Sequence, residues 1–206
     1  MNIVSESESI MPKPEFYRCF LASRPGHALR AALVAQRAAA GQTDRVVPAH
    51  LLHLTWCVVA ETLERDRFVL PRVQAALDGL RLASGPLWLG RVRGGAGGAA
   101  VQSRGPKPEI LALYHNLVAA LAARDLQPLH RKSGFKPHLT LGHDPCAFDP
   151  FPILHLWVPD ELLLIESEVG NTVHNVLARW PLLPPRQGSL ALDPPPSPAA
   201  ADWAFG

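Results

Sequence analysis

The triplet His-Leu-Thr occurs twice in this chain, at residues 53–55 within the stretch HLLHLTWCVVA (50–60) and at residues 138–140 within the stretch KPHLTLGHD (136–144). Both stretches are apolar and bounded by proline or charged residues, as buried strands often are. Side chains two residues apart in a strand point to the same face of the sheet. Each triplet is therefore expected to set an imidazole beside a hydroxyl and to turn its leucine toward the core.

The segments around the triplets alternate between strand-like and helix-like patterns. Further strands are predicted at 16–22, 86–93, 97–103, 161–169 and 172–182. Helices are predicted at 27–41, 73–82 and 108–124. We therefore expect a single folded domain over residues 16–184, between a flexible polar tail at 1–15 and a Pro/Ala-rich tail at 185–206.

Composition narrows the class of protein. The formal net charge is +2 and 18% of residues are charged, which does not suit a protein that binds long nucleic acids mainly through their phosphates. Three widely separated cysteines without CxxC spacing favour the reducing cytoplasm over a disulfide framework. We expect no signal or membrane-spanning segment, no obligate protein partner and a monomer, because long apolar runs and heptads are absent from the sequence.

The two triplets together form a plausible acid–base site. Histidine titrates close to neutral pH, so one neutral imidazole can accept a proton while a second, charged imidazole donates one. Threonine hydroxyls can hydrogen-bond to phosphoryl oxygens. If the two strands lie side by side, His53, Thr55, His138 and Thr140 would suit attack on a phosphodiester without a metal or other cofactor.

These motifs resemble those of a known superfamily. The segments HLTW (53–56) and FKPHLTLGHD (135–144) are similar to the two His-x-Thr motifs of the two-histidine phosphoesterases, and VVPAHLLHLTWCVVAE (46–61) resembles the approach to the first motif. The most similar members are the bacterial and archaeal RNA 2',3'-cyclic phosphodiesterases, also called 2'-5' RNA ligases. Trp56 and His143 depart from the family pattern and leave the substrate range open.

The resemblance implies a fold and an activity. The fold would be a bilobal α+β fold with two antiparallel sheets, flanked by helices, around a central cleft. The activity would be hydrolysis of the 2',3'-cyclic phosphate at an RNA 3' end, or of a small cyclic-phosphate nucleotide, to a 2'-phosphate. By position, His53 would be the proton donor and His138 the proton acceptor, with Thr55 and Thr140 holding the phosphate.

Residues flanking the motifs are candidates for substrate binding. Phe135 could stack on a terminal base or could be a core residue. The basic residues could engage phosphates or could be ordinary solvated charges. These basic candidates are Arg104, Lys107, Arg131, Lys132 and Lys136.

Several alternatives stay open. A metal site at His50 and His53, or at His138 and His143, is disfavoured because each spacing puts the pair on opposite faces of a strand. Cys57 is expected to be a buried, inert thiol. The same site could act on small cyclic phosphates or 2'-5'-linked oligonucleotides, could form 2'-5' bonds by the reverse reaction, or could bind RNA ends without catalysis.

Overall fold

The computed structural model describes residues 13–39, 46–129, 134–145 and 150–185. The predicted tails lie almost entirely outside these ranges. The helices are α1 (His27–Ala39), the 3-10 helix η1 (Ala49–Leu51), α2 (Val69–Leu77) and α3 (Pro108–Ala122). The strands are β1 (Phe16–Ser23), β2 (Leu54–Thr62), β3 (Leu87–Arg93), β4 (Ala99–Arg104), β5 (His138–Gly142), β6 (Phe151–Trp157), β7 (Glu161–Val169) and β8 (Val173–Pro181).

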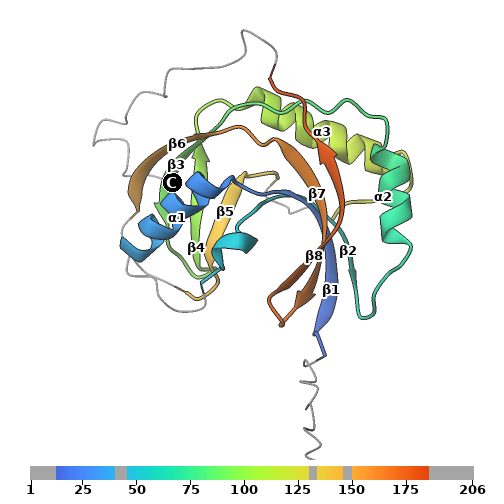
Figure 1. The fold of residues 1–206 in the computed structure, drawn as a ribbon, viewed down its shortest axis with the longest axis horizontal. Coiled ribbons are helices and arrows are strands. Elements are labelled where there is room, and N and C mark those ends of the chain that lie inside the picture. The colour runs from blue at the N-terminus through green and yellow to red at the C-terminus, as the bar shows by residue number, and fades with distance from the viewer. Residues whose placement is uncertain (1–12, 40–45, 130–133, 146–149, 186–206) are drawn as a thin grey trace, which may run out of the picture.

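The strands form an eight-stranded sheet in the order β6-β3-β4-β5-β2-β1-β7-β8, and all neighbouring strands in it are antiparallel (Figure 1). Strands β2 and β5 join its two halves through the register pair Leu54 and Leu139. The halves β6-β3-β4-β5 and β2-β1-β7-β8 correspond to the two sheets that were expected, here continuous at this junction. The α+β fold is therefore confirmed.

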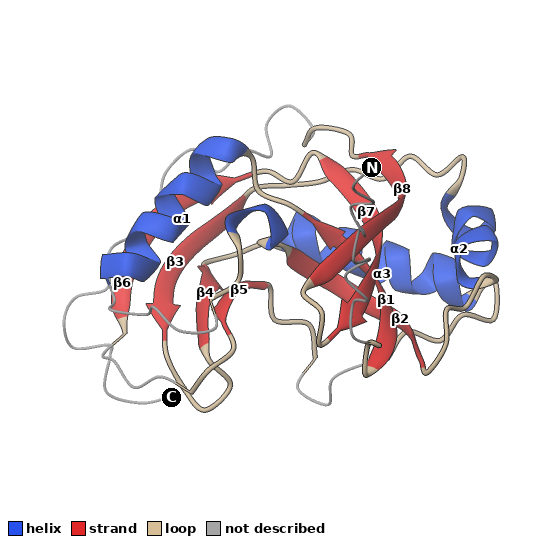
Figure 2. Ribbon diagram, turned by 60° about the horizontal axis from the view of Figure 1, so that its bottom comes forward, coloured by secondary structure: helices blue, strands red, loops and turns tan. Residues whose placement is uncertain are grey.

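The helices cover the outer sides of the two halves. In Figure 2, α1 lies against the half that contains β3 and β6, whereas α2 and α3 lie beside the half that contains β1 and β2. A side-chain contact ties α1 to β6, since Nε2 of Gln36 and Nε2 of His155 are 2.9 Å apart. Helix α3 buries one apolar stripe, Ile110, Leu113, Leu117 and Leu121, at helical spacing. Residues from both halves line one cleft on the side away from these helices.

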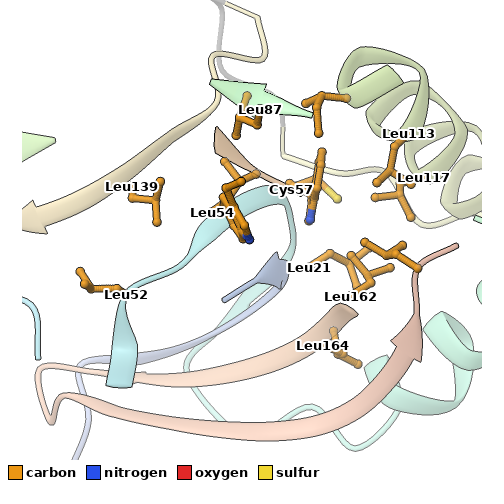
Figure 3. Close-up of a cluster of buried hydrophobic side chains, with 14 of the residues drawn as sticks. Leu21, Leu52, Leu54, Cys57, Leu87, Leu113, Leu117, Leu139, Leu162 and Leu164 are labelled. Atoms are coloured by element: carbon orange, nitrogen blue, oxygen red, sulfur yellow. The ribbon is translucent and has the colours of Figure 1, made fainter. Parts of the chain in front are cut away.

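The main core runs beneath the junction of the halves. Leu54 and Leu139 are completely buried, as the leucine of each triplet was expected to be. Figure 3 shows them among the buried side chains contributed by strands and by α3. With both leucines in the core, the neighbouring histidines and threonines face away from it.

Three details differ from the expected elements. The chain around His50 forms η1, so the strand begins at Leu54 rather than at residue 50. Helix α2 spans Val69–Leu77 rather than 73–82, so it begins four residues earlier than expected and ends before Gly79, which has a φ of +81°. Strand β6 was not predicted because Pro152 interrupts its pattern; β6 is an edge strand, where a missing N–H is tolerated.

Candidate active site

The two His-Leu-Thr triplets meet at the junction of the sheet halves. His53 immediately precedes β2 and His138 begins β5, and the strands are antiparallel around the pair Leu54 and Leu139. Continued by one residue on either side, this register sets His53 across from Thr140 and Thr55 across from His138. The predicted catalytic side chains are thus brought together from segments 85 residues apart, counted from position 53 to position 138.

Both histidines are oriented by the same kind of hydrogen bond. Nδ1 of His53 lies 2.6 Å from the carbonyl oxygen of Leu51, and Nδ1 of His138 lies 2.7 Å from the carbonyl oxygen of Lys136. A carbonyl oxygen can only accept, so Nδ1 carries the proton in each ring. Each neutral ring therefore offers its Nε2 lone pair for proton transfer.

His53, Thr55, His138 and Thr140 all line one cleft of about 1340 Å³. The β2-β1-β7-β8 half contributes Phe20 and His174 to its wall, and the opposite half contributes the turn between β3 and β4. Arg18, Arg93, Lys107, Lys136 and His143 add basic side chains to the lining. The cleft therefore combines two acid–base groups with hydroxyl donors and a partly cationic wall, as a site for an anionic phosphoryl group requires.

His53 is neutral in the ligand-free protein. Burial lowers its pKa from 6.5 to about 4, and the nearby charges of Arg24, His138 and His143 act in the same direction. The hydrogen bond to Leu51 opposes the shift but does not overcome it. A negative charge placed beside His53 would favour its protonated form.

His174 is a site residue that the sequence did not reveal. Its ring lies edge-on to His53 at a centroid separation of 5.3 Å, and both rings contact Phe20, at 5.6 Å and 5.0 Å respectively. His174 lies on β8, more than a hundred residues after His53, and carries no motif of its own. The alternating pattern of TVHNV (172–176) indicates which face of the strand His174 occupies. It does not indicate which residues of other strands share that face.

Only some of the predicted substrate-binding residues line the cleft. Lys136 and Phe135 line the cleft, and Lys136 also supplies the carbonyl that orients His138. Arg104 lies opposite Trp88 in the register of β3 and β4. It is not among the described residues that line the cleft. Arg131 and Lys132 lie outside the described residues.

Phe135 has a packing role. Its ring stacks on Tyr114 at 4.3 Å and on Trp56 at 5.6 Å, and the aromatic cluster rests against the main core. Trp56 is itself buried and donates from Nε1 to the hydroxyl of Ser23 at 2.9 Å. Trp56, one of the two departures from the family pattern, is therefore a core residue. Stacking of a base on Phe135 stays a prediction.

Cys57 and the histidines supply no evident second site. Burial raises the pKa of the Cys57 thiol to about 12, so it is an inert core residue. Among the described residues, no three His, Cys, Asp or Glu side chains are grouped as metal ligands would be. No helix within the described ranges is long and apolar enough to cross a membrane.

Solved structures with this fold include E. coli LigT with phosphate, at 22% identity and a TM-score of 0.65, covering 82% of this chain and 99% of LigT. LigT with 3'-AMP gives 22% identity and a TM-score of 0.64, over 82% and 98%. A protein of Thermus thermophilus gives 24% identity and a TM-score of 0.61, over 80% and 97%. No family model matches the sequence, and no curated protein matches it.

These structural neighbours share the architecture of the chain, so the α+β fold that its motifs suggested is confirmed. The likeness extends over nearly the whole length of each neighbour. At these identities it establishes architecture, while the chemistry depends on the residues in the cleft.

Proposed function

We propose that this protein is a two-histidine phosphoesterase that hydrolyses the 2',3'-cyclic phosphate at an RNA 3' end to a 2'-phosphate. The observation that carries the proposal is the meeting of the two His-Leu-Thr triplets at the pair Leu54 and Leu139. It places two imidazoles and two hydroxyls on one cleft.

In the proposed reaction, water attacks phosphorus and the bond between phosphorus and the ribose 3' oxygen breaks. Nε2 of His138 takes the proton from the attacking water, and Nε2 of His53 gives a proton to the departing 3' oxygen. The phosphate remains on the 2' oxygen. Thr55 and Thr140 donate hydrogen bonds to the phosphoryl oxygens, whose negative charge grows in the transition state.

The neutral state of His53 sets a condition on this mechanism. To act as the acid, His53 must take up a proton when the anionic substrate binds, because its pKa in the free protein is about 4. A phosphodiester anion beside the ring favours the imidazolium form. Proton uptake is therefore part of substrate binding in this proposal.

Two LigT structures support a nucleotide or phosphate as the ligand class, since one holds phosphate and the other holds 3'-AMP. They also favour a second candidate, in which the same site acts on small cyclic-phosphate nucleotides. The reverse reaction, with a ribose hydroxyl in place of water, would form a 2'-5' bond in the same cleft.

The test compares substrates of increasing size in the presence of EDTA. A cyclic mononucleotide, a dinucleotide and a longer RNA, each with a 2',3'-cyclic phosphate, are incubated with the protein, and 2'-phosphate and 3'-phosphate products are separated. Formation of 2'-phosphate, fastest on the RNA substrates, supports the proposal. Preference for the mononucleotide supports the second candidate, and binding of all three without turnover indicates a non-catalytic RNA-end binding module.

A further inference from the structure

His174 shares the cleft with the two catalytic candidates but has no part in the reaction described above. It lines the cleft from β8, and its ring is held edge-on to His53 and to Phe20, at 5.3 Å and 5.6 Å. Phe20 is almost completely buried, which fixes the position of both imidazoles that rest on it. The geometry thus gives His174 a defined position beside His53.

The two nitrogens of His174 have different surroundings. Nδ1 is enclosed and has no hydrogen-bond partner among the described residues. His174 lines the cleft, and since Nδ1 is enclosed, Nε2 is the ring nitrogen left to meet a bound ligand. A neutral imidazole carries one N–H, and a buried donor without an acceptor is costly. The proton is therefore better placed on Nε2, where a bound ligand can accept it.

Arg24 lies near the His53 and His174 rings, behind the residues that line the cleft in the described chain, and adds positive charge beside both rings. Its Nε and Nη2 are enclosed without hydrogen-bond partners in the described part of the chain. Its charge lowers the pKa of both His53 and His174, which places the guanidinium close to both rings. Burial is the main reason that the pKa of His174 falls to about 4, so this ring is a neutral donor near pH 7.

We propose that His174 is a third functional imidazole of the site, which donates a hydrogen bond from Nε2 to an oxygen of the substrate's phosphate beside His53. The inference rests on the proposed function for the identity of the substrate, but it requires only that a phosphate group binds in the cleft. His174 differs from His53 in its role because it donates a hydrogen bond as a neutral ring and keeps its proton, whereas His53 must take up a proton and then transfer it to the departing oxygen.

Three substitutions separate hydrogen bonding from packing. His174→Phe keeps an aromatic ring against Phe20 and His53 but removes both nitrogens. His174→Gln can place an amide nitrogen about where Nε2 lies, and His174→Asn can place one about where Nδ1 lies. The matched controls are His27→Phe and His27→Gln, because His27 is exposed at the start of α1.

The first readout is the dissociation constant for inorganic phosphate, measured by NMR titration of each folded variant. We expect His174→Phe and His174→Asn to weaken binding roughly tenfold, with His174→Gln losing much less and the His27 variants unchanged. If His174→Phe binds phosphate as the wild-type protein does, His174 only packs and the inference is wrong. Rescue by asparagine rather than glutamine, or no phosphate binding by the wild-type protein, would also overturn it.

The second readout is kcat and KM on a cyclic-phosphate dinucleotide. His174→Phe should raise KM or lower kcat in proportion to its loss of phosphate affinity. A wild-type protein that binds phosphate through His174 but turns over none of the cyclic substrates would end the proposed function and leave the inference intact. Normal turnover by the wild-type protein, with phosphate affinity and kinetics unchanged in His174→Phe, would support the proposed function and overturn the inference about His174.

Discussion

His53 and His138 are anchored in the same way, each donating from Nδ1 to the carbonyl oxygen two residues earlier, at 2.6 Å and 2.7 Å. The matched anchors leave the same ring nitrogen, Nε2, available on both sides of the cleft. The surroundings of His53 are distinctive, because burial lowers the pKa of this part-buried ring to about 4 and the charge of Arg24 acts in the same direction. For His53 to act as the proposed proton donor, ligand binding must therefore change its charge state.

Phosphate should raise the pKa of His53 above its ligand-free value of about 4. A bound anion offsets the cost of burying the imidazolium, so the titration should move toward neutral pH. The measurement is a pH titration of the His53 ring signals by NMR with and without inorganic phosphate, assigned with His53→Gln. An unchanged pKa in the phosphate complex would argue against His53 as the proton donor.

The protein should lose stability as the pH falls from about 6.5 toward 4. The pKa values of His53 and His174 are about 4 when folded and return to about 6.5 on unfolding, so the unfolded chain binds more protons in this range. Each histidine should account for about 2 kcal/mol of this loss between pH 7 and pH 5, so the two together for about 4 kcal/mol. Urea unfolding at pH 7 and pH 5 measures it.

Carboxylates also titrate between these pH values, so the comparison needs a matched variant. His174→Phe keeps the ring contacts and removes one titrating group, and its free energy of unfolding should depend less on pH than that of the wild-type protein. Equal pH dependence in the two proteins would show that His174 is not held neutral by the fold.

Removing either threonine hydroxyl should slow turnover. Thr55→Val and Thr140→Val preserve side-chain shape but delete the donor beside the phosphate, and losing one such donor lowers kcat by about 100-fold. Thr62→Val is the control on the same strand, where the hydroxyl donates to the carbonyl of Glu64 away from the cleft. If Thr55→Val were as active as Thr62→Val, Thr55 would have no role in holding the phosphate.

The turn between β3 and β4 should tolerate alanine at one glycine and not at its neighbour. A Cβ on Gly98 would lie 2.0 Å from the carbonyl oxygen of Gly142, and the residue has a φ of +96°. A Cβ on Gly97 meets nothing within 4 Å. Gly98→Ala should therefore cost about 2 kcal/mol or more in unfolding free energy, and Gly97→Ala much less. Equal midpoints in urea would contradict the close approach to β5.

The sequence predicted which side chains of each triplet lie together because each triplet is a local pattern. The spacing i, i+2 within a strand already places His53 beside Thr55 and His138 beside Thr140. The alignment of the two triplets at Leu54 and Leu139 depends on pairing between distant strands, which local patterns do not encode. The expectation that both triplets share one cleft came from the family resemblance.

Single residues without a motif were beyond sequence reasoning. Arg24, just after β1, and His174, on β8, come close to His53 through strand pairings that involve most of the chain. Strand β6 was missed for a different reason, because Pro152 is unfavourable in a strand unless the strand lies at an edge. Knowledge of the sheet order was needed in both cases.

The most direct test of the central claim is turnover of a short RNA ending in a 2',3'-cyclic phosphate by the wild-type protein, His53→Ala and His138→Ala, with EDTA present. We predict conversion to the 2'-phosphate by the wild-type protein and a loss of at least about 100-fold in each folded variant, as expected when an acid or a base is removed. Turnover that survives in either folded variant, or none by the wild-type protein, would contradict the account.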